Sequence, residues 1–276
     1  MSLRFYDAHN HLQDERFGGR QAELIAECER AGVARLVVNG SCEDDWPQVL
    51  ELTRHAQVVP SFGYHPWYIH ERTPEWQKSL IHFLAQCPSA VGEIGLDRWK
   101  PDLDYSGQEE VFIAQLRIAA ERNLPVSIHC LQAWGRMLEI LRDTPRPRCG
   151  FLLHSYGGPK EMVKSLSELG AYFSMPGYFA HGRKERQREA FRHVPPGRLL
   201  LETDAPDQML PQIQNQFIPA GVIPFTEETT GKAFNHPANI AAVYAFASGL
   251  FGESLESLAT RVEENFFRLF GGVTQR

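Results

Sequence analysis

The sequence contains few of the features that anchor a protein in a membrane or cross-link it. No window approaches the roughly 20 apolar residues that a membrane-spanning helix needs, and no signal-peptide-like apolar run precedes the first motif, which begins at Asp7. The five cysteines are scattered, odd in number and include no C-x-x-C pair, so they indicate neither a zinc ribbon nor a disulfide framework. We therefore expect a cytoplasmic protein with reduced thiols and no membrane partner.

An excess of positive charge is missing as well. The 276 residues include 34 acidic and 28 basic side chains, which gives a formal net charge of −6. This balance argues against a protein that holds nucleic acid through a broad basic surface, because Lys and Arg supply most of the non-specific affinity for phosphates. It does not exclude a nuclease, since a metal cluster can bind a phosphodiester locally.

Internal repeats and low-complexity segments are also absent, and what recurs is a short apolar run followed by a longer, charged, helix-like stretch. We expect strands at Arg4–His11, Arg35–Gly40, Val58–Tyr64, Ala90–Leu96, Pro125–His129, Gly150–His154, Ala171–Ser174 and Leu199–Asp204. Between them we expect helices at Arg20–Ala31, Pro74–Gln86, Gln108–Arg122, Ala133–Arg142, Lys160–Leu169 and Arg183–His193. Strands that alternate with helices predict a parallel α/β fold, either a closed barrel or a doubly wound sheet.

The last quarter of the chain has a different character. The stretch Gln208–Asn235 is rich in Pro, Gly and Gln, and in a barrel it would form a long loop at the mouth, where the βα loops lie. Apolar residues at approximate helical spacing within Pro237–Phe270 predict two closing helices. We expect residues 1–276 to form a single domain.

His9 and His11 form an H-x-H pair at the end of the first expected strand. Because side chains alternate along a strand, both imidazoles point to the same side, at the spacing that lets one ion take two nitrogens. The pair alone is a weak signal, since two polar histidines on a surface strand are at least as common. Four further ionisable residues strengthen it, because each follows or interrupts an apolar run near the end of another expected strand: Glu93, His129, His154 and Asp204.

These six residues suggest two divalent ions rather than one, because four imidazoles and two carboxylates exceed the ligands of a single catalytic zinc. Glu93 is expected to bridge the ions. His9, His11 and Asp204 would hold the first ion, and His129 and His154 the second. This partition favours a closed (β/α)8 barrel, in which the first and eighth strands are neighbours. Four histidines favour zinc over Mg or Mn, and Asp204 could also orient the attacking water or accept its proton.

Several other residues carry weaker signals. His65, in GYHPW, is expected to contact substrate, although a plain loop histidine fits as well. Glu202 would lie behind the ligands on the side of Asp204, as a residue that supports them or as an ordinary buried ion-pair partner. Trp67 and Tyr68 could stack on a ring or simply pack locally. A cluster of cations after the seventh strand could meet phosphates, although a solvated helix face explains it better: Arg183, Lys184, Arg186 and Arg188.

Taken in order, the motifs DAHNHL, GYHP, GEIGLD, PVSIHC, HSYGG and LLLETDAP resemble those of the TatD family of metal-dependent deoxyribonucleases, within the amidohydrolase superfamily. The similarity runs from Asp7 to Pro206 and more loosely to Asn239. It implies a (β/α)8 TIM barrel, two divalent ions and hydrolysis of DNA phosphodiester bonds, with single strands or ends as substrate and exonuclease action. The six residues predicted as metal ligands fall on family ligand positions.

Two departures from the family pattern affect the expected substrate. Asp207, Gln208 and Met209 stand where the family often has an aromatic residue and a leucine, and His236 replaces the glutamate of an N-E-P motif. We expect both to lie on or near substrate loops. The alternatives are therefore an amidohydrolase acting on a small amide, lactone or phosphoester, and a non-enzymatic metal-binding protein, which would be expected to lack one or more of the ligands.

Overall fold

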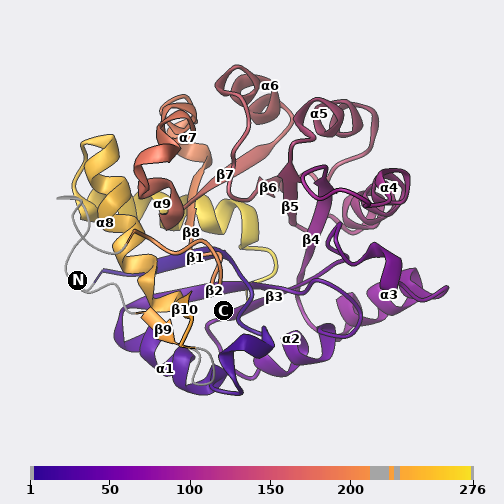
Figure 1. The fold of residues 1–276 in the computed structure, drawn as a ribbon, viewed down its shortest axis with the longest axis horizontal. Coiled ribbons are helices and arrows are strands. Elements are labelled where there is room, and N and C mark those ends of the chain that lie inside the picture. Colours follow the sequence, from indigo (N-terminus) through magenta and orange to yellow (C-terminus); the bar gives the residue numbers. More distant parts are fainter. Residues whose placement is uncertain (1–2, 212–223, 227–230, 275–276) are drawn as a thin grey trace.

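The fold is described from a computed structural model, which covers residues 3–211, 224–226 and 231–274. Its centre is a sheet of eight parallel strands in the order β1 to β8, surrounded by helices (Figure 1). The strands are β1 Phe5–Asn10, β2 Val33–Asn39, β3 Val58–Phe62, β4 Ala90–Asp97, β5 Val126–Leu131, β6 Phe151–Leu153, β7 Ala171–Pro176 and β8 Leu199–Glu202. The sequence therefore predicted all eight strands, within a few residues of their bounds.

The sheet closes on itself beyond the ends of β1 and β8. The backbone N–H of Asp204 donates to the carbonyl of His9 at 3.0 Å, and that of His11 donates to the carbonyl of Ala205 at 2.8 Å. These bonds complete a (β/α)8 barrel, as predicted, and exclude the doubly wound alternative.

Seven helices between the strands cover the outside of the barrel: α1 Gln21–Arg30, α2 Trp46–Leu52, α3 Trp76–Gln86, α4 Tyr105–Arg122, α5 Trp134–Asp143, α6 Val163–Glu168 and α7 Glu185–Phe191. The sequence analysis missed α2, whose seven residues are too few to establish a periodic pattern. It also began α4 three residues late, because Asp104 caps the helix by accepting a hydrogen bond from the backbone N–H of Gly107 at 2.9 Å.

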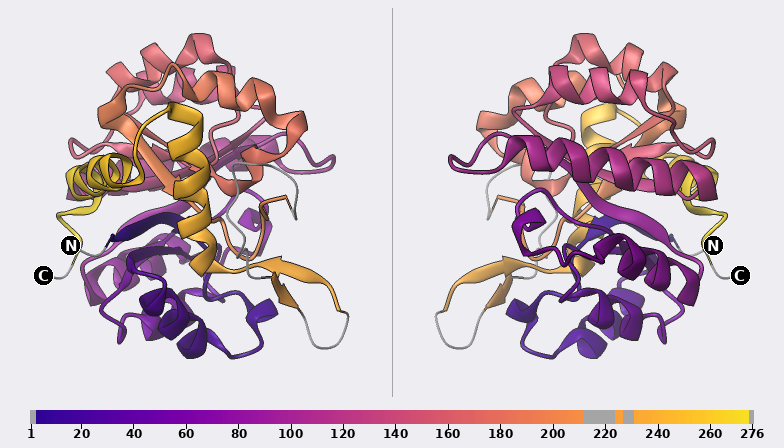
Figure 2. Two further views of the ribbon diagram at one scale, coloured as in Figure 1. Left: turned by 90° about the vertical axis from the view of Figure 1, so that its left-hand side faces the viewer. Right: turned by 90° about the vertical axis from the view of Figure 1, so that its right-hand side faces the viewer.

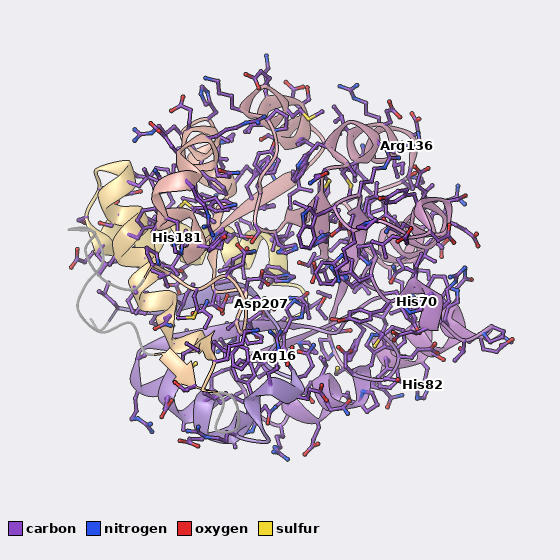
Figure 3. All side chains as sticks on the ribbon, viewed as in Figure 1. Arg16, His70, His82, Arg136, His181 and Asp207 are labelled. Atoms are coloured by element: carbon purple, nitrogen blue, oxygen red, sulfur yellow. The ribbon has the colours of Figure 1, made fainter. Side chains whose placement is uncertain are left out.

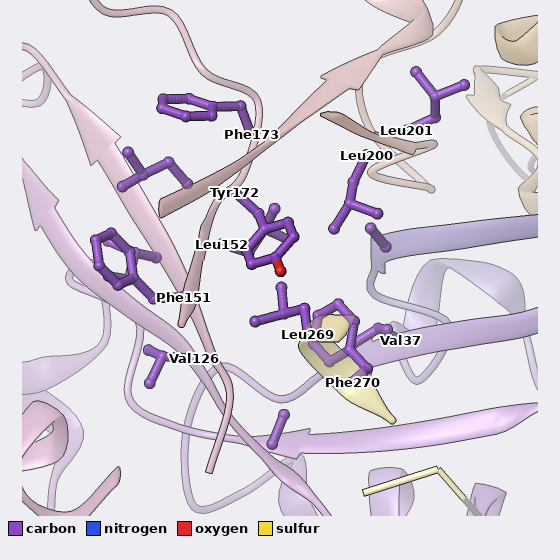
Figure 4. Packing of buried hydrophobic residues seen from close by; sticks show 14 of the residues in the cluster. Val37, Val126, Phe151, Leu152, Tyr172, Phe173, Leu200, Leu201, Leu269 and Phe270 are labelled. Atoms are coloured by element: carbon purple, nitrogen blue, oxygen red, sulfur yellow. The ribbon is translucent and has the colours of Figure 1, made fainter. Parts of the chain in front are cut away.

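The two predicted closing helices are α8 Ile240–Phe251 and α9 Leu255–Phe270. Asn265 of α9 donates to the carbonyl of Leu199, where β8 begins, at 2.9 Å. At the end of α9, Leu269 and Phe270 pack among barrel residues such as Val37 and Leu200 (Figure 4). Since α9 covers the end where the strands begin, the carboxyl ends remain available for a functional site.

Part of the stretch predicted as one long loop forms strands. A short hairpin of β9 Pro224–Thr226 and β10 Ala233–Asn235 extends from the body of the barrel (Figure 2). The remainder of the predicted loop, residues 212–223 and 227–230, lies outside the described residues. Within the part of the chain that the structure describes, no helix is long and apolar enough to cross a membrane.

Candidate metal centre

The six predicted ligands meet towards the carboxyl end of the barrel, because five of them lie near or just beyond the end of a strand and Glu93 lies within β4. Glu93 is almost fully buried, with 2% of its surface exposed. Gly95 brings β4 and β5 together at this point. It has φ +148°, and a Cβ on it would collide with the carbonyl oxygen of His129. Only glycine accommodates this close approach, which places Glu93 and His129 in contact.

One oxygen of Glu93 faces His9 and His11. Glu93 Oε2 lies 3.3 Å from Nε2 of His9 and 3.1 Å from Nε2 of His11. Asp204 Oδ1 lies 3.6 Å from each of the same two nitrogens. The set His9, His11 and Asp204 thus presents three ligand atoms within 4.8 Å of one another, as a single ion requires.

The other oxygen of Glu93 faces three histidines on the opposite side. Glu93 Oε1 lies 2.8 Å from Nε2 of His154, 2.9 Å from Nδ1 of His129 and 3.4 Å from Nε2 of His65. The two oxygens of one carboxylate therefore face two separate groups of ligands. His65 belongs to this second group. It therefore lies closer to the predicted ligands than expected of a residue that contacts only substrate or of a plain loop histidine. The sequence offered no signal for this, because His65 follows a strand at a less regular distance than the others.

The imidazoles of His11 and His129 are oriented by acceptors behind them. Nδ1 of His11 lies 2.8 Å from the carbonyl oxygen of Asn39, so in the neutral ring Nδ1 carries the proton and Nε2 keeps its lone pair. Nε2 of His129 lies 2.9 Å from Asp97 Oδ2, which leaves the lone pair on Nδ1 when the ring is neutral. Both free lone pairs then point towards Glu93, the arrangement by which supporting residues prepare histidines for a metal.

His9 and His154 have corresponding partners. Nδ1 of His9 lies 2.7 Å from Ser127 Oγ, and Nδ1 of His154 faces Glu202 Oε1 at 3.8 Å. Glu202 is fully buried, and accepts hydrogen bonds from Ser174 Oγ and from Oγ and the backbone N–H of Ser155. The predicted place of Glu202 behind the ligands fits this geometry. Sequence reasoning missed Asn39, Asp97 and Ser127, although each is a polar residue in or at the end of an apolar strand.

Burial and charge act in opposite directions on the cluster. Burial lowers the pKa of His9 to about 3 and that of His65 to about 4, so both rings are neutral. Burial also opposes protonation of His11, but its hydrogen bond to Glu93 and the charge of that carboxylate raise its pKa to about 9. The surrounding histidines outweigh the burial of Glu93 and hold its pKa well below the usual range. A cation entering the cluster would meet a carboxylate anion and would displace protons from imidazoles.

Gln208, one of the departures from the family pattern, lies against the centre. Its Nε2 donates to Asp204 Oδ2 at 2.6 Å and to Ser155 Oγ at 2.5 Å. Asp204 Oδ1 faces His9 and His11, so the amide of Gln208 occupies the other side of the carboxylate. Gln208 therefore fixes the rotation of the Asp204 carboxylate.

Replacing Gln208 with leucine should lower kcat about tenfold with a smaller change in KM, within the range found when residues supporting metal ligands are removed. The leucine cannot donate to Asp204 Oδ2, and the carboxylate is then free to rotate. Steady-state kinetics would measure the effect. Gln48→Leu is the matched control, because it makes the same chemical change on α2, at a residue that has no contact with Asp204 in the described structure. Equal effects of both substitutions would show that Gln208 does not position Asp204.

His236, the other departure, lies away from the cluster. Its Nε2 lies 2.6 Å from Glu27 Oε2 on α1, and its Nδ1 accepts from the backbone N–H of Ala238 at 3.0 Å. The side chain is 1% exposed. His236 therefore has a structural role and not the expected role near the substrate. It links the residue that follows β10 to α1.

A cavity of about 1060 Å³ opens beside His11, His65 and Glu93. Six further carboxylates line it: Asp14, Glu15, Asp44, Asp45, Glu51 and Asp207. Its two arginines are already paired. Arg16 binds Asp14 and Asp207 at 2.7 and 2.8 Å, and Figure 3 shows Arg16 and Asp207 close together over the barrel. Arg54 binds Glu51 at 2.7 Å. We call this surface the acidic wall.

The predicted basic cluster after β7 does not line this cavity. Arg183 and Lys184 pack on the ring of Tyr178, and Arg188 donates to the carbonyls of Phe179 and His181. Arg186 and Arg188 border a different hollow beside α7 and α8. Arg183, Lys184 and Arg188 therefore make most of their contacts within the segment that follows β7.

Comparison with known proteins relates this geometry to one family. Residues 6–271 match the model of the TatD related DNases. The chain is 27% identical over 274 residues to the uncharacterized metal-dependent hydrolase YjjV of Escherichia coli, covering 98% of this chain and 99% of YjjV. It is 29% identical to the 3'-5' ssDNA/RNA exonuclease TatD of Escherichia fergusonii, covering 96% and 98%. The crystal structure of YjjV superposes with a TM-score of 0.86 at 26% identity, covering 98% of this chain and 99% of that one.

Proposed function

The chain belongs to the TatD family of metal-dependent hydrolases, and on this basis we propose that it is a nuclease that removes nucleotides from the 3' end of single-stranded nucleic acid. The direction and the substrate are those in the names of its TatD relatives. We further propose that two divalent ions are held by the six predicted ligands, with Glu93 between them. Their four histidines favour zinc, and manganese or magnesium are the alternatives for the assay.

One observation about Glu93 carries the assignment of a metal. Glu93 Oε1 is buried and, among the described residues, accepts no hydrogen bond, although imidazole nitrogens lie 2.8 and 2.9 Å from it. With neutral imidazoles this buried oxygen has no donor, which costs several kcal/mol. Burial opposes protonation of His129 and His154, but the charge of Glu93 helps to raise the pKa of both. A cation between the carboxylate and the imidazole lone pairs would take the place of these protons, so the donor set fits a divalent ion.

Each residue of the centre has a separate role in hydrolysis. Bound divalent ions supply a Lewis acid and lower the pKa of water, and a pair can stabilise both the attacking and the leaving oxygen. Asp204 would orient the attacking water or accept its proton, because its carboxylate lies in the centre, 3.6 Å from Nε2 of both His9 and His11. Glu93 keeps the two halves of the site at a fixed separation. His65, which lines the cavity and lies 3.4 Å from Glu93, contacts an oxygen of the substrate.

The acidic wall favours a second candidate function, which is hydrolysis of a small amide or lactone that is neutral or positively charged. A polyanion is repelled by six carboxylates with two paired arginines, whereas such a molecule is not. The same metal centre would serve both reactions.

Hydrolysis by the metal-stripped protein, with zinc, manganese or magnesium added back, tests the proposed function. Cleavage of a single-stranded oligonucleotide labelled at its 5' end should return with metal and yield products shortened from the 3' end. His129→Ala should lose it, whereas His193→Ala, at an exposed residue just after α7, should retain it. An oligonucleotide left intact with every ion, by protein that has bound the metal, would overturn the nuclease assignment in favour of the small-molecule reaction.

A further inference from the structure

The loop between β4 and α4, residues 98–104, is attached directly to the candidate metal centre. Asp97 Oδ2 accepts hydrogen bonds from His129 Nε2 at 2.9 Å and from Trp67 Nε1 at 2.8 Å. Asp97 Oδ1 accepts from the backbone N–H of Trp99 at 2.7 Å. One buried carboxylate therefore fixes a predicted ligand, the indole of Trp67 and the first turn of the loop relative to one another.

This loop exposes an aromatic ring beside a cation. Trp99 is 56% exposed, more than any other large hydrophobic side chain of the described residues. Lys100 places its Nζ 3.4 Å from the centre of the Trp67 ring, and it forms no salt bridge with a carboxylate in the described part of the chain. An exposed indole next to an ammonium that has no carboxylate partner suits a ligand with a flat ring and a negative charge.

The other charged residues of the loop take part in an ion pair, in capping α4 or in the turn of the loop. Arg98 packs on Tyr105 and lies 3.5 Å from Glu109, and Asp104 caps α4. Asp102 follows with φ +65° at the turn of the loop. Among the described residues of this loop, Lys100 is thus the cation without a carboxylate partner, and its ring contact with Trp67 leaves the ammonium able to accept an anion, while both arginines of the acidic wall are ion-paired.

We propose that Trp99 and Lys100 form a nucleotide-binding subsite, in which the indole stacks on a base and the ammonium binds an adjoining phosphate. Trp67 holds Lys100 in place beneath them. The strand then leaves the metal centre over the β4–α4 loop and avoids the acidic wall. Aromatic stacking combined with a positive charge is the general means of binding single strands without regard to sequence. The inference rests on the proposed function, because it names how that substrate is held.

Two substrates separate binding in this subsite from catalysis. We would compare Trp99→Ala and Lys100→Ala with the wild type, all loaded with metal, on a single-stranded oligonucleotide and on bis(p-nitrophenyl) phosphate. The small diester reaches the metals without a neighbouring nucleotide. Loss of one stacked base should raise the KM for the oligonucleotide about tenfold, and the loss on the oligonucleotide should exceed that on the small diester by a similar factor.

The matched controls are Phe267→Ala and Lys78→Ala, which remove an exposed aromatic ring and an exposed ammonium on α9 and α3. They should not discriminate between the two substrates. Equal losses on both substrates in Trp99→Ala and Lys100→Ala would overturn the subsite, because they would indicate a merely structural role.

Binding of a non-hydrolysable phosphorothioate oligonucleotide, measured by fluorescence anisotropy, keeps this inference separate from the proposed function. If the wild type binds this strand but leaves the ordinary oligonucleotide intact with every ion, the nuclease assignment fails while weaker binding by Trp99→Ala still supports the subsite. Unchanged binding in both loop variants would overturn the subsite even in an active nuclease.

Discussion

Glu93→Ala should reduce kcat by about 10³-fold or more, as expected when a group central to charge stabilisation is removed, while the barrel stays folded. The two oxygens of Glu93 face separate groups of imidazoles at 2.8 to 3.4 Å, so its removal affects both halves of the site at once. Glu93→Gln retains the volume of the side chain but not its charge and should be almost as inactive. Steady-state hydrolysis and metal content, with circular dichroism to verify folding, would measure these effects.

Glu121→Gln on the exposed face of α4 is the control for Glu93→Gln, because it makes the same chemical change away from the centre. It should be fully active. A Glu93→Gln variant that kept its activity and its metal after stripping and reconstitution would show that the bridge, and with it the two-ion assignment, is wrong.

Glu202→Ala should lower the free energy of unfolding by about 3 kcal/mol, the lower end of the cost of breaking a buried charged pair. Ser155 and Ser174 would lose a common acceptor, and His154 would lose the carboxylate that faces its Nδ1. Burial opposes protonation of His154, but Glu93 and Glu202 raise its pKa well above the usual value. Urea unfolding of the metal-free protein would measure the change in stability.

Glu202→Gln separates stability from metal binding. The amide keeps the shape of the side chain but provides no negative charge behind His154. Metal affinity should fall about 10- to 100-fold, the usual effect of removing a residue that supports a ligand. Calorimetric titration with zinc would measure it. A variant with wild-type affinity would assign Glu202 to stability alone.

The metal ligands could be predicted because side chains alternate along a strand and because a barrel brings the carboxyl ends of its strands together. Ionisable residues near those ends therefore meet, whatever the details of packing. The residues behind them could not. Asp97 reaches His129 only because β4 and β5 pair with Gly95 opposite His129, and a sequence does not reveal the register of parallel strands. The sequence predicted that His65 is a substrate contact or a plain loop residue, because nothing in GYHPW shows that the loop folds back to Glu93. The role of Gln208 likewise depends on a turn in which Asp204 and Gln208 both have positive φ.

Metal stoichiometry tests the central claim most directly. Zinc would be added in steps to the stripped protein, and bound metal and hydrolysis of an oligonucleotide would be followed together. We expect about two ions per chain, as in other two-metal hydrolases, with full activity only at the second equivalent and at most one tight ion in Glu93→Gln. Saturation at a single ion with full activity, or binding that Glu93→Gln leaves unchanged, would contradict a centre built around Glu93.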